Sequence, residues 1–144
     1  MLLGEYEHTI DDKNRLTLPA KFREAFEDGC VVTRGLDGCL HAWPKEAWQQ
    51  LVDSRLASLD LLSVQGRRLH RHFFSGANET APDKQGRVSV PPALLTHAKL
   101  GRDVVVAGVN DHLEIWDRAA WKRELAEVEG SAEDVAERLA AQGS

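Results

Sequence analysis

The stretch DDKNRLTLP at residues 11–19 recurs, with variations, as DKQGRVSVP at residues 83–91, and this recurrence decides how the chain folds. Both stretches contain an Asp, an Arg four residues after it, a triplet that alternates apolar, hydroxyl and apolar side chains, and a Pro. The offset between the two stretches is 72 residues. Self-similarity at a fixed period of this size indicates a duplicated structural unit.

The duplication extends well beyond this motif. After one inserted residue the two halves align at an offset of 73, and each half holds two tryptophans five residues apart, Trp43 and Trp48 in the first and Trp116 and Trp121 in the second. Because the chain has only four tryptophans, this coincidence supports a tandem repeat. A module of about 70 residues buries little core alone, so we expect the two copies to share one core.

Each copy predicts the same order of elements. The alternating triplet is typical of a half-buried strand, and the Pro after it suits the first turn of a short helix. A run of apolar residues then indicates a buried strand, a further strand ends at the first Trp of the pair, and an amphipathic helix follows. The first strand, the short helix, the buried strand and the amphipathic helix fall at residues 15–18, 19–26, 31–33 and 44–59 in the first copy, and at 87–90, 92–98, 104–106 and 117–128 in the second. The further strand ends at Trp43 in the first copy and at Trp116 in the second.

This order of strands and helices predicts an α+β fold. Residues 5–9 show no clear period, although they stand where a first strand is expected. Gly66 is expected to weaken a helix that links the copies, and the C-terminal end either forms one more amphipathic helix or frays. The expected divisions are a first module at 1–60, a helical linker at 61–75, a second module at 76–128 and an acidic tail at 129–144.

The net charge of −5 is unevenly distributed along the chain. Residues 124–144 carry six acidic side chains and one basic side chain, which accounts for all of the net charge. Residues 1–123 hold 17 acidic and 17 basic side chains. The body of the protein is therefore free to carry a local basic patch.

The repeated Asp-x-x-x-Arg element is the leading candidate for a binding function. Across a tight turn, the carboxylate of Asp11 or Asp83 can accept backbone N–H bonds and approach the guanidinium of Arg15 or Arg87. A guanidinium is planar, always charged and a forked donor, so it suits phosphate or the edge of a guanine. The alternative is an ion pair that stabilises the turn and binds nothing.

Other residues surround these turns in the sequence. Between residues 13 and 23 there are four basic side chains and no acidic one, which makes a basic strip plausible. The residues predicted to bind DNA are Arg15, Arg87, Lys13, Lys84, Lys21 and Arg23. The residues predicted to shape the turns are Asp11, Asp83, Asn14 and Gly86, since Asn and Gly tolerate a positive φ best.

Several other classes of protein are disfavoured. The sequence contains no phosphate-binding loop, nucleophile elbow, zinc-protease or dinucleotide motif, so we expect no enzymatic activity. Cys30 and Cys39 cannot form a zinc site by themselves, and His70 and His72 form an isolated pair, so we expect no metal and no cofactor. No run of 18 apolar residues exists and the first residues lack the features of an export signal, which predicts a cytoplasmic protein without a membrane span.

The tandem Asp-x-x-x-Arg turns, each followed by an alternating triplet and Pro, resemble the paired AbrB-type (SpoVT-AbrB) modules of the MraZ family. Residues 113–116, which end the late strand, and the arginines at 67, 68 and 71 also resemble that family. The similarity runs over roughly residues 1–125, and the motifs are specific as a set. The family's motif Arg corresponds to Arg15 and Arg87, and its motif Asp to Asp11 and Asp83. The family often has Gly before the Arg, whereas this chain has Asn14 in the first copy, which we expect to alter loop stiffness alone.

The resemblance implies a transcriptional regulator that associates with the nucleoid. It implies sequence-specific binding of double-stranded DNA at repeated promoter elements of the division and cell-wall operon, which includes the regulator's own gene. It also implies a swapped-hairpin β-barrel with flanking helices, built from both modules of one chain, and a ring-shaped homo-oligomer. The expected partners are therefore DNA and further copies of the chain, with no membrane and no small-molecule substrate.

A protein-interaction module of the antitoxin kind is the alternative function. AbrB-type folds also occur in antitoxins, where a C-terminal tail binds a toxin, and the acidic tail of this chain fits that role. Antitoxins usually carry one module per chain, so the two modules favour the regulator. The arginines at 67, 68 and 71 either contact DNA or an acidic neighbour, or simply form the solvated face of a helix.

Overall fold

A computed structural model describes residues 1–143, and Ser144, the last residue of the expected tail, lies outside the described part. The first copy contains β1 (Leu2–Thr9), β2 (Arg15–Thr17), the 3₁₀ helix η1 (Ala20–Phe26), β3 (Cys30–Arg34), β4 (Leu40–Pro44), α1 (Lys45–Leu51) and the π-helical turn η2 (Val52–Leu56). Helix α2 (Val64–Gly76) joins the copies. The second copy contains β5 (Asn78–Thr80), β6 (Arg87–Ser89), α3 (Pro92–His97), β7 (Asp103–Asn110), β8 (Leu113–Asp117) and α4 (Arg118–Gln142).

The two copies exchange strands. The main sheet has six antiparallel strands in the order β1-β7-β8-β4-β3-β5. Strand β1 of the first copy therefore pairs along its whole length with β7 of the second, and β5 of the second pairs with β3 of the first. A separate two-stranded ribbon pairs β2 with β6, again one strand from each copy. Neither copy forms a complete sheet alone.

One hydrophobic core lies between the ribbon and the main sheet. The alternation of the triplets places Leu16 of β2 and Val88 of β6 fully in this core. The short helices that follow the prolines add Phe22 from the first copy and Leu94 from the second. Both copies thus contribute to a single cluster, as their small size requires.

The expected closed β-barrel is wrong, because the main sheet is open. Strands β1 and β5 lie at its two edges, and the ribbon is a separate sheet that meets the end of β1 through an isolated bridge between Ile10 and Leu16. Strand β5 has three residues, and Pro82 follows two residues after its end. Proline has no N–H group for a ladder, which limits how far this edge extends.

Strand β1 and helix α2 also differ from the elements predicted there. Strand β1 covers eight residues, although the sequence showed no period there, because it pairs fully with β7. Helix α2 begins only after Ser63, whose hydroxyl accepts a hydrogen bond from Gly66 N at 2.9 Å. A Cβ on Gly66 would collide with the backbone oxygen of Asp60. Gly66 therefore permits the preceding loop to approach the helix, instead of merely weakening it.

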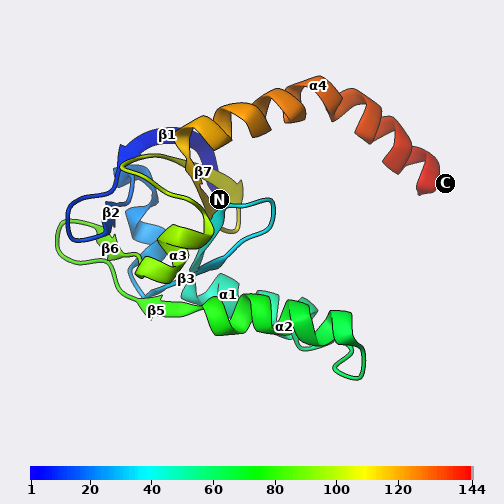
Figure 1. Cartoon of the computed structure of the whole chain (residues 1–144), viewed down its shortest axis with the longest axis horizontal. Helices are drawn as coiled ribbons and strands as arrows, with labels where there is room; N and C mark the ends of the chain where they lie inside the picture. The colour runs from blue at the N-terminus through cyan, green and yellow to red at the C-terminus, as the bar shows by residue number, and fades with distance from the viewer. Residues whose placement is uncertain (144) are drawn as a thin grey trace.

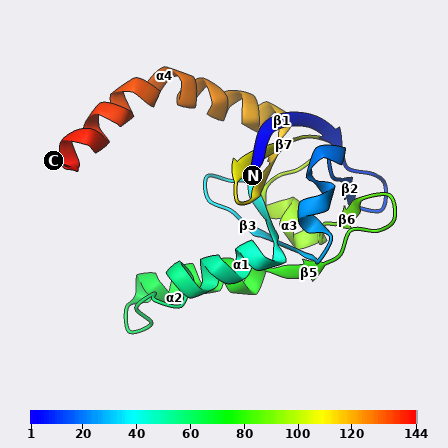
Figure 2. The ribbon, with the colours of Figure 1, turned by 180° about the vertical axis from the view of Figure 1, so that it is seen from behind.

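Helix α4 continues without a break through the segment expected to be a separate tail. It has 25 residues, its N-terminus is capped by Asp117, and the expected boundary at residue 129 lies inside it. The two views agree that α2 and α4 project from one end of the molecule and that the β2–β6 ribbon lies at the other (Figure 1, Figure 2). Within residues 1–143, no helix is both long and apolar enough to cross a membrane.

The pairing of β1 with β7 can be tested at Gly108, which lies opposite Gly4. A Cβ on Gly108 would lie 2.6 Å from the backbone of Leu2 and Leu3, whereas a Cβ on Gly101 would meet no atom within 4 Å. We expect Gly108→Ala to lower the free energy of unfolding by about 1–3 kcal/mol. Gly101→Ala should change it by less than about 0.5 kcal/mol. Urea denaturation of both variants measures this, and equal stabilities would contradict the pairing.

Candidate nucleic-acid interface

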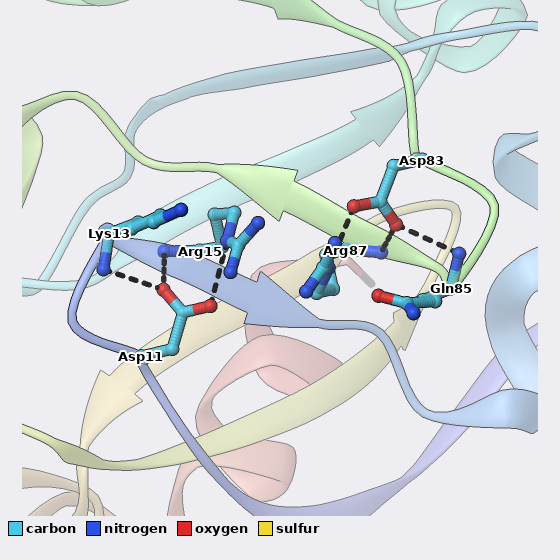
Figure 3. Close-up of polar contacts among 6 residues, drawn as sticks. All are labelled: Asp11, Lys13, Arg15, Asp83, Gln85 and Arg87. Atoms are coloured by element: carbon cyan, nitrogen blue, oxygen red, sulfur yellow. Dashed lines mark hydrogen bonds and ion pairs between the residues drawn. The ribbon is translucent and has the colours of Figure 1, made fainter.

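The first Asp–Arg turn is built by one carboxylate. Asp11 Oδ1 accepts hydrogen bonds from the backbone N–H groups of Lys13 and Arg15, both at 2.9 Å. Asp11 Oδ2 accepts a hydrogen bond from Arg15 Nε at 2.7 Å. The backbone N–H of Asn14 donates to Asp11 O at 3.0 Å and closes the turn. A single side chain thus fixes both the backbone of the turn and the guanidinium (Figure 3).

The second turn repeats this geometry at the same distances. Asp83 Oδ1 accepts from the backbone N–H groups of Gln85 and Arg87 at 2.9 Å, and Asp83 Oδ2 accepts from Arg87 Nε at 2.7 Å. Asn14 and Gly86 occupy equivalent places with φ of 59° and 76°. This left-handed conformation is why Asn or Gly stands there. Asp11, Asp83, Asn14 and Gly86 are the four residues that the sequence predicts to shape the turns.

The ribbon brings the two arginines to one face. In the register of β2 and β6, Arg15 lies opposite Ser89 and Arg87 lies opposite Thr17, while Leu16 lies opposite Val88. Residues opposite one another in a ladder point to the same side, and neighbours in a strand point to opposite sides. Because Leu16 and Val88 point into the core, Arg15 and Arg87 both point outward, one from each copy (Figure 3).

Each guanidinium is held at one nitrogen and open at the others. The side chains of Arg15 and Arg87 retain 28% and 29% exposure, and within residues 1–143 their only hydrogen bonds and ion pairs are those that Nε makes to the Asp. The Nη1 and Nη2 groups therefore remain free to donate to an external acceptor. Oriented N–H donors that stay free are suited to an anion or to a base edge.

The carboxyl groups in the turns are ionised at neutral pH. Hydrogen bonds from the backbone N–H of Arg15 lower the pKa of Asp11 below its ordinary value, and those from Arg87 do the same for the pKa of Asp83. The side-chain N–H bond and the positive charge of the same arginine add to this effect. The fold thus favours the charged carboxylate, which keeps the guanidinium in place.

The structure brings only some of the other predicted residues to the turns. Lys13 and Lys84 are exposed within them. Arg23 packs against the second turn, where a Cβ on Gly86 would collide with its Nε, and it donates to Leu18 O at 3.2 Å. Lys21 instead lines a hollow with residues 1, 2 and 44.

Arg102 is a basic residue near the first turn that sequence reasoning missed. It shares a hollow with Asp11 and Asn14, and its backbone oxygen accepts a hydrogen bond from Ile10 N at 2.8 Å. Arg102 is exposed and lies just before β7. The repeat aligns the preceding Gly101 with Gly29 of the first copy. This match does not predict that Arg102 lies beside the first turn.

The remaining candidates lie elsewhere. Arg67 donates to Leu61 O at 3.0 Å on the projecting α2, away from the ribbon (Figure 1). Trp43 and Trp116 are buried with 4% exposure each, so they are packing residues rather than platforms for bases. His72 bonds to Gly35 O at 2.8 Å while the His70 ring packs on Phe74, so that pair does not converge on one point.

These features define a class of protein: a duplicated, strand-exchanged α+β chain with one Asp–Arg turn per copy on a shared ribbon. The sequence profile of the MraZ protein family, whose description likens it to antitoxins, matches residues 1–72 and 73–142. This chain therefore belongs to the MraZ family. The two matches begin 72 residues apart, which confirms the duplication.

Relatives at high identity cover nearly the whole chain. A protein of Roseiflexus castenholzii is 45% identical over 140 residues, which is 97% of each chain. A protein of Limosilactobacillus fermentum is 53% identical over 121 residues and 84% of each chain. A third, of Heliobacterium modesticaldum, is 45% identical over 96% of each chain. All three are named transcriptional regulator MraZ.

The role of the turn carboxylates can be tested by their pH dependence. We expect Asp11→Ala and Asp83→Ala each to lower the melting temperature at pH 7, because three donors lose their acceptor. The pKa of each carboxyl is lowered by folding, so its stabilisation is complete above the unfolded value of about 3.9 and fades as pH falls through the lower folded value. The difference in melting temperature between the parent and each variant should therefore shrink as the pH falls below about 3.9. Thermal melts at several pH values measure this.

Asp134→Ala is the matched control for this experiment. Asp134 also pairs with an Arg four residues later, Arg138, at 2.7 Å, but on the exposed surface of α4. The Asp134→Ala substitution should leave the melting temperature unchanged. If Asp11→Ala and Asp83→Ala behave like this control at pH 7, the turns do not depend on their carboxylates.

Proposed function

We propose that this protein is a transcriptional regulator that binds double-stranded promoter DNA through the outer face of the β2–β6 ribbon. The observation that carries the proposal is the pair of guanidiniums, one from each copy, that stand side by side with their Nη groups free. The names of the relatives support regulation of transcription, and the geometry of the ribbon supports this surface as the contact.

The ribbon has the two strands and the donors that this role requires. The major groove of B-DNA admits a two-stranded β-ribbon, and a guanidinium donates well to guanine O6 and N7 or to phosphate. Because Asp11 and Asp83 already hold Nε, little side-chain freedom is lost when Arg15 and Arg87 bind. Lys13, Lys84, Arg23 and Arg102 supply further positive charge around this pair, whereas the position of Lys21 makes it a weaker candidate.

The proposal extends to assembly. A ring of copies joined head to tail would present many ribbons, and weak contacts would add up on promoter elements repeated at a fixed spacing. Apolar side chains that such contacts would cover are exposed on the projecting helices, at Leu61, Leu62, Val64 and Leu69 around α2 and at Val128, Val135 and Leu139 on α4. The similarity to the family also suggests the targets: the division and cell-wall operon and the protein's own gene, hence a place on the nucleoid in the cytoplasm.

A second function is favoured by α4. This helix is exposed over most of its length and carries the six acidic side chains that account for the net charge. It also exposes apolar side chains, and this combination suits an antitoxin-like contact with another protein. A mobility-shift assay with the DNA upstream of the protein's own gene separates the two functions. Binding through α4 alone predicts no shift.

The central test replaces the two arginines. We expect Arg15→Ala and Arg87→Ala to leave folding and assembly intact, to weaken DNA binding by about 1–3 kcal/mol each, and to relax specificity or flatten the salt dependence. Each phosphate contact contributes about one unit to Z in a slope of roughly −0.9Z for log K against log salt. Circular dichroism and binding curves at several salt concentrations measure both properties on the same samples.

Arg138→Ala is the matched control, because it removes the same kind of Asp–Arg pair from α4. It should bind DNA like the parent. The rival view, that the Asp–Arg turns are purely structural, predicts that Arg15→Ala and Arg87→Ala destabilise the fold while the folded fraction binds normally. Normal binding by fully folded variants would overturn the assignment of the ribbon.

Assembly makes a separate prediction. Light scattering coupled to gel filtration should give a mass several times that of the 16.0 kDa chain. Replacing the exposed Leu62 and Leu139 by Ser should reduce this mass, because the contacts proposed to join copies use these helices. A parent that elutes as a 16.0 kDa monomer at working concentrations would contradict the ring.

A further inference from the structure

A cluster of three potential metal ligands lies where the two copies meet, on the seam between β4 and β8. Cys39 comes immediately before β4 and His41 lies within it, so their side chains fall on the same side of that segment. Glu114 of β8 stands directly opposite His41 in the ladder. The thiol, the imidazole and the carboxylate each place one donor atom within 4.8 Å of the other two.

The spacing of these donors is close to that of a zinc site. Zinc lies about 2.0–2.3 Å from nitrogen, oxygen and sulfur ligands in tetrahedral geometry, so neighbouring donors stand roughly 3.3–3.8 Å apart. His41 Nε2 and Glu114 Oε2 are already 3.8 Å apart. Small rotations of the Cys39 and Glu114 side chains would complete the geometry, since all donors lie within 4.8 Å.

No direct bond within the described chain accounts for this convergence. A separation of 3.8 Å between His41 Nε2 and Glu114 Oε2 is too long for a hydrogen bond. Cys39 Sγ makes a weak bond to Leu36 O at 3.2 Å. A Cβ on Gly35 would lie 2.8 Å from both Cys39 Sγ and His41 Nε2, so the glycine leaves the approach to these two atoms open.

The surroundings hold the ligands in position. Trp116 Nε1 donates to Glu114 Oε1 at 3.0 Å and leaves Oε2 directed toward the cluster. The His41 ring packs against the rings of Trp43, Phe73 and His112. Cys39 is fully buried and His41 has 8% exposure, while the Glu114 side chain has 22%, which provides a path for an ion. The hydrogen bond from Trp116 to Glu114 is an outer contact of the kind that orients a metal ligand, whereas packing alone holds the His41 ring, whose Nδ1 has no hydrogen-bond partner among residues 1–143.

We propose that Cys39 Sγ, His41 Nε2 and Glu114 Oε2 bind one divalent zinc ion, with water as the fourth ligand. The thiol proton passes to the solvent as the Zn–S bond forms, and the thiolate and carboxylate then balance the two charges of the ion. A mixed set of sulfur, nitrogen and oxygen donors suits Zn²⁺ among the common divalent ions. The ion would tie β4 of the first copy to β8 of the second and so stabilise the seam.

From the sequence we predicted no metal site, because Cys30 and Cys39 by themselves supply too few ligands. Cys30 lies on β3 within the hydrophobic core and is not part of the cluster. The ligands that accompany Cys39 come from a strand of each copy, and only the strand exchange brings Glu114 opposite His41. The proposed site is independent of the DNA contacts, since none of its ligands lies on the ribbon.

The test uses the full, untagged chain after dialysis against a chelator, with Co²⁺ as the probe and Zn²⁺ as the competitor. We expect one Co²⁺ per chain, a thiolate-to-cobalt charge-transfer band in the near ultraviolet, tetrahedral d–d bands in the visible, and displacement by one equivalent of Zn²⁺. Cys39→Ala should abolish the charge-transfer band and weaken Zn²⁺ binding at least about a hundredfold, more than the loss of an outer contact does. Cys30→Ala is the matched control and should keep both.

The outcomes separate clearly. A parent without the charge-transfer band, a Cys39→Ala variant that keeps it, or a Cys30→Ala variant that loses it would overturn the site. If circular dichroism shows that Cys39→Ala does not fold, Glu114→Gln decides, because its side chain is partly exposed and the substitution preserves its shape. We expect Glu114→Gln to weaken Zn²⁺ binding at least about tenfold, and unchanged affinity in that variant would equally overturn the proposal.

Discussion

The exchange of strands between the two copies is the constraint on which the rest of the structure depends. Strand β1 satisfies its ladder only with β7, β5 only with β3, and β2 only with β6. Strand β4 also pairs with β8, so four of the pairings cross from one copy to the other. Backbone N–H and C=O groups left unpaired in a small core would be costly. The copies are therefore two halves of one folding unit, not domains that associate after folding.

The exchange also fixes the two Asp–Arg turns. Asn14 O, in the first turn, accepts a hydrogen bond from Val90 N of the second copy, and Gly86 O, in the second turn, accepts one from Leu18 N of the first, both at 2.8 Å. Each turn is thus closed internally by its Asp and externally by the other copy. The left-handed residue that permits the turn also presents the carbonyl that crosses the ribbon. The placement of Arg15 and Arg87 follows from this reciprocal arrangement.

The local features of the sequence predicted the structure where local chemistry decides it. The alternating triplets gave the ribbon strands and the prolines gave the short helices, because period and fixed φ act within a few residues. Strand β1, the open edges of the sheet and the position of Arg102 depend on which distant segments meet, and no local period encodes that. Gly66 shows the same limit, since a glycine is needed there because the backbone of Asp60 approaches the helix closely. The proposed zinc ligands are a further example, because His41 and Glu114 stand at equivalent positions of the two copies, a full repeat apart in the sequence.

The distribution of charge explains how a chain with a net charge of −5 can still present a basic face. The acidic surplus lies on α4, whose 25 residues extend about 37 Å at 1.5 Å per residue. The helix projects from the end opposite the ribbon (Figure 2). At physiological ionic strength, the field of exposed charges is largely screened beyond about 8 Å. The acidic helix and the proposed DNA face therefore act as separate electrostatic surfaces, and the net charge of the chain says little about either one.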